Sequence, residues 1–189
     1  AELVDQARNE VGQIRELIDE VLFLSELESG SRVVSLGAVA VRPELEAVAA
    51  ELEDRASRAG VALAVEGDPG IELEIRPRML RVVAQNLAEN AILYAGPGAT
   101  FTLAIERDGD TMILRGTDDG VGVDETDLSR LFERFYRADR ARASRGTGLG
   151  LALVYSIVRD MDGSVSIQSP ANPASGRGTR VLVSLPRAT

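Results

Sequence analysis

The sequence contains no cysteine, no histidine and no tryptophan, and aromatic residues make up only 4% of it. Without cysteine the chain can form neither a disulfide nor a thiolate metal site. Without histidine it has no imidazole of its own. The hydrophobic core must be built from valine, leucine, isoleucine and alanine, and recognition of nucleic acid by base stacking is not expected.

Lysine is also absent, so all 21 basic residues are arginine, which we attribute to codon bias in the source. Against them stand 30 acidic residues, which give a net charge of −9. This balance argues against a general binder of nucleic acid or of anionic membranes. No apolar run approaches the roughly 20 residues that span a bilayer, and no signal peptide opens the sequence. We expect a cytoplasmic protein, or the cytoplasmic portion of a membrane-anchored sensor, with no nucleic acid partner and no membrane contact within this segment.

Residues 1–30 form a first unit, predicted to be one long amphipathic helix. Val11, Ile14, Ile18 and Val21 recur at intervals of three and four residues, and Gly30 is placed to end the helix. An apolar stripe this wide needs cover, either from the rest of the chain or from another helix. Without that cover we expect self-association through the stripe or fraying of the helix start.

Residues 31–189 form the second unit, in which helical and strand-like patterns alternate. Its predicted architecture is a two-layer α/β sandwich, a mixed sheet covered on one face by helices. The β-prone segments are Ser31–Leu36, Val61–Val65, Ile71–Ile75, Thr100–Glu106, Thr111–Thr117, Ser164–Ser169 and Thr179–Leu185. Helices are expected over Arg42–Ala59 and Pro77–Tyr94, in the segment "DLSRLFERFYRA", and after the glycines of "RGTGLGLA".

Three motifs carry candidate chemistry. In "RGTGLGLA", glycines at every second position precede a helix whose first N–H groups can hold an anion such as phosphate, although a plain glycine-rich connection has the same pattern. In "QNLAENAILYA", Asn86 and Asn90 project from one helix face, where their amide oxygens suit Mg²⁺, or alternatively face solvent. In "TDDGVGVDE", Asp118 ends an apolar strand before Gly120 and Gly122, where a carboxylate can accept from the amine of adenine, or simply form a common turn.

Together with "LFERFYR", these motifs resemble the N, G1, F and G2 boxes of the histidine-kinase catalytic domain, within the superfamily that includes gyrase B, Hsp90 and MutL. The resemblance covers about Val33 to Pro186 and implies the Bergerat-type ATP-binding fold. Residues 1–30, ending "LFLSELESG", resemble the second helix of the dimerisation and histidine-phosphotransfer hairpin, with the first helix absent.

The resemblance implies a role for each matching residue, with ATP and Mg²⁺ as cofactors. Asn90 corresponds to the Mg²⁺ ligand, Asn86 to a residue that orients the phosphates or the metal, and Asp118 to the residue that binds adenine N6. The other implied nucleotide-binding residues are Tyr94, Gly120, Gly122, Tyr136, Arg137, Gly146, Thr147, Gly148, Leu149, Gly150 and Thr179. The implied catalytic residues are Asn86, Asn90 and Arg137, and Arg137 is the positively charged residue that reaches the phosphates. Residues 123–147 correspond to the ATP lid.

Two departures from the family pattern stand out. Leu93 occupies a position where these kinases often have a basic residue, and Arg140, Arg142 or Arg145 could substitute for it. The chain also lacks the histidine that accepts the phosphoryl group. Truncation before the first hairpin helix explains this absence, and degeneration of the kinase is the competing explanation.

Asn86 favours kinase over hydrolase chemistry. Gyrase-type and Hsp90-type relatives have a glutamate base four residues before the metal asparagine, whereas Asn86 has no basicity, and Glu89 points roughly 100° away from Asn90 on the helix. We therefore expect a sensor histidine kinase whose partners are a response-regulator receiver domain and a histidine-bearing helix of the same or a partner protomer, in a full-length homodimer. The alternatives are an anti-sigma-factor serine kinase and a degenerate nucleotide-binding interaction module.

Overall fold

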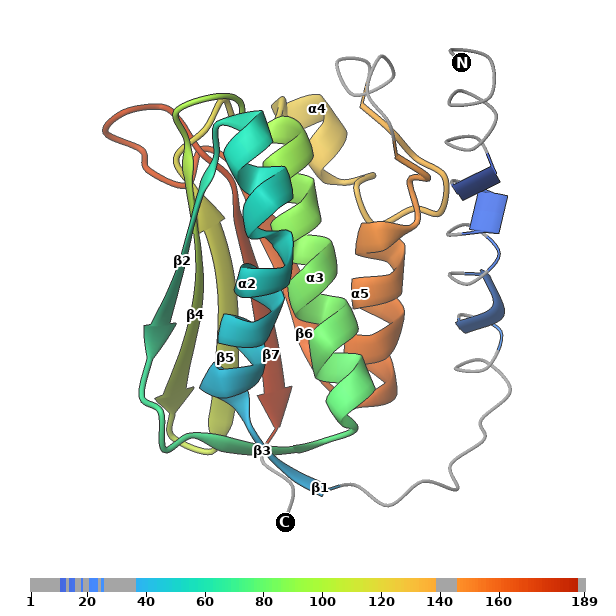
Figure 1. Ribbon diagram of the computed structural model, residues 1–189, viewed down its shortest axis with the longest axis vertical. Helices are drawn as coiled ribbons and strands as arrows, with labels where there is room; N and C mark the ends of the chain where they lie inside the picture. Colours follow the sequence, from blue (N-terminus) through green and yellow to red (C-terminus); the bar gives the residue numbers. More distant parts are fainter. Residues whose placement is uncertain are drawn as a thin grey trace.

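A computed structural model describes residues 37–138 and 146–186, together with residues 11, 12, 14, 15, 18, 21–23 and 25 of the N-terminal segment (Figure 1). Its centre is a sheet of five strands in the order β2-β4-β5-β7-β6. The strands are β2 (Ala62–Gly67), β4 (Thr100–Asp108), β5 (Thr111–Asp118), β6 (Ser164–Gln168) and β7 (Arg180–Pro186).

The sheet is mixed. Strands β2 and β4 are parallel, and every other neighbouring pair is antiparallel, including the expected hairpin of β4 with β5 and the closing pair of β6 with β7. A separate antiparallel pair joins β1 (Gly37–Ala40) to β3 (Glu72–Ile75). The strand β1 was not anticipated from the sequence, and the β-prone segment Ser31–Leu36 lies outside the described residues.

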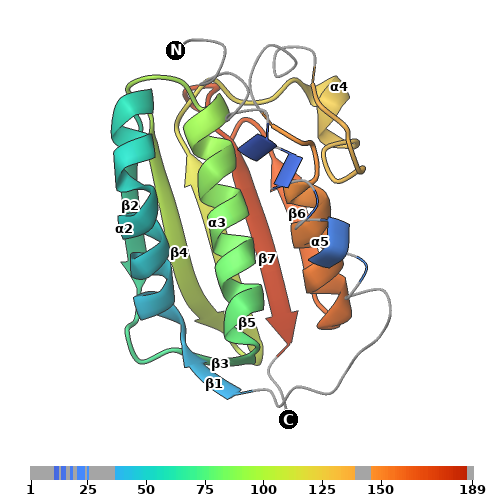
Figure 2. The same ribbon diagram turned by 45° about the vertical axis from the view of Figure 1, so that its right-hand side comes forward.

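Three helices lie side by side on one face of the sheet, as the two views in Figures 1 and 2 agree. They are α2 (Val41–Ala59), α3 (Pro77–Tyr94) and α5 (Gly150–Asp160), with α3 between the other two. A short helix, α4 (Glu125–Leu128), lies at one end of this layer. The two-layer α/β sandwich predicted from the sequence is confirmed.

The alternation of β5 shows how the sequence directs its side chains. Met112, Leu114, Gly116 and Asp118 are buried on the helix-covered face, and the residues between them are only half-buried. Leu114 belongs to the same core as Leu80 of α3, each 2% exposed or less. Truncating such a leucine to alanine costs about 2–5 kcal/mol of stability. Because Asp118 follows in the same register, the strand delivers a carboxylate to the buried side of the sheet at its end.

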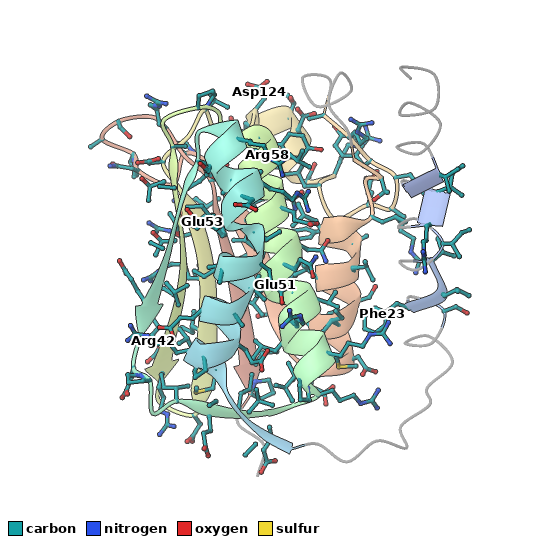
Figure 3. The ribbon with its side chains drawn as sticks, in the orientation of Figure 1. Phe23, Arg42, Glu51, Glu53, Arg58 and Asp124 are labelled. Atoms are coloured by element: carbon teal, nitrogen blue, oxygen red, sulfur yellow. The ribbon has the colours of Figure 1, made fainter. Side chains whose placement is uncertain are left out.

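Ion pairs join the outer surfaces of α2 and α3. Arg81 pairs with Glu51 and with Glu44, and Arg55 pairs with Glu89. Figure 3 shows Glu51 on the side of α2 that faces α3. These side chains are partly exposed, so each pair contributes at most about 1 kcal/mol. They lie on the side of α3 that faces α2, away from α5.

The described residues of the N-terminal segment are helical, as expected. On the predicted apolar stripe, Val11, Ile14, Ile18 and Val21 are exposed by 65%, 59%, 49% and 41%. The buried side chain is instead Phe23, with the guanidinium of Arg78 lying 4.6 Å from its ring centre (Figure 3). The described part of the chain therefore does not cover the stripe.

The prediction of a helix over "DLSRLFERFYRA", residues 127–138, is largely wrong. Helix α4 ends at Leu128, and turns follow it. Phe135 has a φ of 63°, and its N–H donates to Gly148 O at 2.9 Å. A left-handed residue whose amide bonds to a distant carbonyl cannot continue a right-handed helix.

Among the described helices, none is both apolar enough and long enough to cross a bilayer.

Candidate functional site

The residues Asn86, Asn90 and Tyr94 lie at intervals of four on α3 and therefore share one face of it. The glycine segment 146–150 runs along this face in the opposite direction. A Cβ on Gly146 would lie 2.9 Å from the hydroxyl oxygen of Tyr94, and a Cβ on Gly150 would lie 2.5 Å from Asn86 Oδ1. Asn90 is midway between these two contacts, so it faces the glycine segment. The structure thus brings together the asparagine and glycine motifs.

The two asparagines have different surroundings. Asn86 Nδ2 donates to Val82 O at 2.8 Å, and its Oδ1 adjoins the first residue of α5. Asn90 Nδ2 is buried and has no hydrogen-bond partner among the described residues. Buried amide groups in native proteins are nearly always bonded, so this one points to an acceptor that a ligand supplies. A carboxamide can donate from its nitrogen to a phosphate oxygen while its oxygen coordinates a hard cation such as Mg²⁺.

The glycine segment can approach a ligand only through its backbone. Gly148 has a φ of 74°, and a Cβ there would lie 2.9 Å from the backbone of Phe135. Thr147 Oγ1 accepts from Leu149 N at 3.2 Å, just before α5 begins. Leu149 is one of the residues implied to bind the nucleotide. Its side chain is fully buried, so only its backbone can face the site. The helix start therefore presents N–H groups, with their partial positive charge, beside Asn86.

The carboxylate of Asp118 marks the other end of the site. Its Oδ1 accepts from Gly120 N at 2.9 Å and from Thr179 N at 3.2 Å. Burial raises the pKa of Asp118 above its ordinary value, although these two backbone bonds and one with the Thr179 side chain act to lower it. An ionised carboxylate offers about four lone-pair positions, so three internal bonds leave it able to accept from one more donor. The exocyclic amine of adenine is such a donor.

Glycine is required after Asp118 because this turn packs tightly against its neighbours. A Cβ on Gly120 would lie 2.2 Å from Ala95 O, directly after α3. Gly122 has a φ of 77°, and Val121 N donates to Ala95 O at 3.0 Å. The Asp118 turn is therefore joined to the end of α3, near Tyr94. The two ends of the candidate site share one helix.

The described part of the predicted lid is held together internally. Tyr136 donates from its hydroxyl to Asp127 Oδ1 at 2.5 Å, and the Arg130 guanidinium lies 4.1 Å from its ring centre. Arg137 follows, half-buried. Because Phe135 bonds to Gly148, this segment is fastened to the glycine motif. Arg140, Arg142 and Arg145, the candidate substitutes for a basic residue at position 93, lie outside the described residues.

Two further predictions concern other residues of α3. Glu89 accepts from Arg55 Nη1 at 2.5 Å, on the side of α3 that faces α2. This carboxylate is therefore turned away from the face that carries Asn90. Leu93 is partly exposed, at 37%. It adds no charge near the asparagines.

Sequence reasoning missed Ser169. Its hydroxyl oxygen accepts from Val123 N at 2.9 Å, and the hydroxyl donates to Gly178 O at 3.0 Å. Val123 is the first residue of the predicted lid. A single serine at the end of a short strand carries no signal in the sequence, because its partners lie 46 and nine residues away.

Comparisons with known proteins identify the family of this chain. The family described as "Histidine kinase-, DNA gyrase B-, and HSP90-like ATPase" matches residues 75–189. The sensor protein SphS of Synechococcus elongatus is 34% identical over 97% of this chain and 46% of its own length. The chain spans less than half the length of the curated relatives it matches first.

Solved structures show the same fold. The histidine kinase AdeS of Acinetobacter baumannii superposes with a TM-score of 0.79 and 22% identity, over 96% of this chain and 82% of AdeS. Full-length ShkA, solved in complex with AMPPNP, superposes with a TM-score of 0.81 and 27% identity, over 95% of this chain and 37% of ShkA. The chain therefore belongs to the family of histidine kinase-, DNA gyrase B- and HSP90-like ATPases, as the ATP-binding catalytic domain of a sensor histidine kinase.

Proposed function

We propose that this domain holds Mg·ATP between α3 and the glycine segment 146–150, and promotes transfer of the γ-phosphoryl group to a histidine outside this chain. The observation that carries the proposal is the buried amide nitrogen of Asn90, unpaired among the described residues and facing the glycine segment. A phosphate oxygen gives that nitrogen the acceptor it lacks. The bound cofactor supplies the transferable phosphoryl group, and Mg²⁺ neutralises the charge that develops on it.

Each remaining element has one part in this proposal. Asp118 accepts from the adenine amine, and Gly120 and Gly122 let the nucleotide approach the backbone. The N–H groups at the start of α5 bind phosphate oxygens, where the helix dipole favours negative charge. Asn90 contributes its amide oxygen to the metal, and Asn86 keeps the start of α5 at a fixed distance from α3. The rest of the nucleotide-binding surface is assigned from the resemblance to the family and consists of Tyr94, Tyr136, Arg137 and Thr179.

Transfer to a side chain is favoured over hydrolysis because, among the residues that the structure describes, no base adjoins the position proposed for the metal. Asn86 stands where a hydrolase of this superfamily has its glutamate, and an amide cannot accept a proton from water. The nearby carboxylate, Glu89, is engaged by Arg55 on the α2 side of the helix. Catalysis then rests on positioning and charge neutralisation, which suits phosphoryl transfer to a docked imidazole.

The acceptor belongs to a second unit in this proposal. Residues 1–30 act as the second helix of a dimerisation and histidine-phosphotransfer hairpin, and residues 31–189 as the catalytic unit. The exposed apolar stripe of the N-terminal segment fits a helix that packs against other helices. The phosphorylated histidine then passes its phosphoryl group to the receiver domain of a response regulator.

Two measurements test the proposal. Calorimetric titration with Mg·ATP should give binding that Asn90→Ala weakens by at least about tenfold, the effect of losing a charge-assisted contact to metal and phosphate. With γ-labelled ATP and a longer chain that includes the preceding helix, label should appear that is labile in acid and stable in base, as expected of phosphohistidine. Asn172→Ala, on an exposed loop, is the matched control and should behave as the wild type.

The outcomes separate the alternatives. No heat and no rise in melting temperature at millimolar Mg·ATP would leave only a nucleotide-free interaction module. Acid-stable label on serine of an added protein would favour the anti-sigma-factor serine kinase. Full activity of Asn90→Ala would remove this residue from the metal role.

A further inference from the structure

The five-stranded sheet has helices on one face only, and none of the described helices lies over the other face (Figures 1 and 2). Along β5 and β7, buried residues that face the helices alternate with half-buried residues that point to the uncovered side. Thr117 and Arg180 are two of the latter, and they are partners in the register of β5 with β7. Thr102 of β4 pairs with Thr117, and Gln168 of β6 pairs with Arg180. These four side chains form one polar row across the uncovered face.

Two side-chain atoms of this polar row are buried and have no hydrogen-bond partner among the described residues. They are Thr117 Oγ1 and Arg180 Nε, which belong to residues directly opposite each other. Buried polar groups in native proteins are nearly always bonded, and each one left unpaired lowers stability. Two such atoms side by side indicate that the row receives a hydrogen-bonding group from outside the described residues.

Arg115 shows how the same face accommodates another arginine. It lies two residues before Thr117, so its side chain points to the same face, and its guanidinium pairs with Glu106 at 3.0 Å. The ion pairs of the described residues do not include Arg180. Its neighbours in register, Thr117 and Gln168, are uncharged. The polar row therefore has one cation and, within the described part of the chain, no anion paired with it.

An oxyanion supplies the partner that both buried atoms lack. The guanidinium of Arg180 donates through its planar fork, and the Thr117 hydroxyl and the Gln168 amide can donate beside it. One guanidinium provides one positive charge, which matches a carboxylate, whereas a phosphate ester carries about −1.5 to −2 at pH 7. The net charge of −9 on the chain further disfavours a second negative charge. The chemistry of the row thus selects a carboxylate.

We propose that this polar row binds an aspartate or glutamate side chain of a partner protein that docks on the uncovered face of the sheet. The same face carries half-buried Ile113 and Leu182, which a protein segment can cover together with the row. Asp118 follows Thr117 and points to the helix-covered side. The docking site is therefore separate from the nucleotide site and does not rest on the proposed nucleotide-binding function.

Nuclear magnetic resonance of the Arg180 Nε–H group tests the carboxylate chemistry. Titration with sodium acetate, at an ionic strength fixed with sodium chloride, should shift this resonance with a dissociation constant on the order of 10–100 mM, the range for one charge-assisted pair. Thr117→Val should weaken acetate binding roughly two- to tenfold, because one donor is lost. Arg115→Gln, on the same face, is the matched control and should bind as the wild type. Inorganic phosphate should bind more weakly than acetate. No shift with acetate, or phosphate binding as tight as acetate, would contradict the proposal.

A pair of peptides tests whether the carboxylate comes from a protein. The probe is a tripeptide with glutamate between two leucines, blocked at both ends, and its reference has glutamine in place of glutamate. The glutamate peptide should bind at least about threefold more tightly than acetate, because its leucines cover apolar surface beside the row. The glutamine peptide should bind at least about tenfold more weakly than the glutamate peptide. Equal affinities for acetate and the glutamate peptide would indicate a small carboxylic acid as the ligand and refute docking of a protein.

Melting temperature separates a binding role of Arg180 from a structural one. Arg180→Gln should weaken binding of acetate and of the glutamate peptide at least about tenfold, yet lower the melting temperature by less than about 2 °C, since the Nε–H has no bond to lose. A larger loss of stability with unchanged acetate binding would make Arg180 structural. If Arg180→Gln does not fold, Arg180→Lys keeps the charge without the fork and should weaken binding at least about threefold; unchanged binding would count against the site. Mg·ATP should bind Arg180→Gln as it binds the wild type, so a wild-type chain that fails to bind Mg·ATP refutes only the proposed function.

Discussion

Asn86 and Asn90 lie one turn apart on the same face of α3, but their carboxamides differ in what they contact. Asn86 bonds to Val82 O and adjoins Gly150, whereas the amide nitrogen of Asn90 is buried without a partner in the described part of the chain. A buried unpaired amide lowers the stability of the protein on its own, and a ligand acceptor removes that penalty. The two residues should therefore respond to mutation in opposite ways.

We expect Asn90→Ala to leave the free energy of unfolding unchanged or to raise it by up to about 1 kcal/mol, because the unpaired amide is gone. Asn86→Ala should lower it by about 0.5–1.5 kcal/mol, because the bond to Val82 O and the contact with Gly150 are lost. Chemical denaturation without nucleotide measures both. A strong destabilisation by Asn90→Ala would show that its amide already has a partner.

The contact between Gly120 and Ala95 predicts a steric effect. A Cβ at position 120 would lie 2.2 Å from Ala95 O, so Gly120→Ala must displace the Asp118 turn from the end of α3. We expect a loss of about 1–3 kcal/mol in stability, as for an overpacked core. The nucleotide affinity should fall with it.

Gly37→Ala is the control for this change. Nothing lies within 4 Å of a Cβ at Gly37, so its replacement should alter the free energy of unfolding by less than about 0.5 kcal/mol. Thermal melting of both variants gives the comparison. Equal melting temperatures for the two would mean that the turn after Asp118 can shift freely.

Much of this fold could be predicted from hydrophobic periodicity. The alternation in β5 places Met112 and Leu114 in the core, and the side chain of Asp118 lies on the same face of the strand. The interval of four residues likewise places Asn86 and Asn90 on one face of a helix. Both conclusions need only local geometry, which the sequence specifies directly.

The remainder of the site depends on contacts between distant segments. That the glycine segment runs along α3 from Tyr94 to Asn86 follows from the packing of α5 against α3, which no local pattern encodes. The left-handed Phe135 reflects a bond to Gly148, so the helical period before it was misleading. Phe23 was missed because the apolar stripe of its segment points elsewhere.

The pKa of Asp118 predicts how stability depends on pH. Burial raises this pKa in the folded state above the ordinary carboxyl value, so the folded protein binds the proton more tightly than the unfolded chain. The contribution of Asp118 to stability is therefore greatest below about pH 3.9 and is lost as the pH rises through the folded pKa.

Asp118→Asn should remove this loss while keeping an oxygen acceptor for Gly120 N and Thr179 N. At pH 7 we expect the variant to be at least as stable as the wild type, and the difference to shrink as the pH falls toward 4. Its affinity for ATP should drop at least about tenfold, because an amide donor can now face the adenine amine. Denaturation at several pH values and calorimetry at pH 7 measure the two effects. A variant that is less stable at pH 7 and more stable at pH 4 would reverse the sign and contradict this account.

The ion pair between Arg55 and Glu89 bears on whether Glu89 acts as a catalytic base. Glu89 accepts from Arg55 on the side of α3 that faces α2, away from the face that carries Asn90. If Glu89 has no part as a base, Glu89→Gln should bind Mg·ATP as the wild type does and transfer phosphate to a histidine-bearing helix at a rate within about twofold. The lost ion pair is partly exposed and should cost at most about 1 kcal/mol of stability. Arg55→Gln is the matched control, since it breaks the same pair without touching a carboxylate. A fall in transfer rate of a hundredfold or more in Glu89→Gln alone would identify Glu89 as the base and would require α3 to turn that face toward the nucleotide.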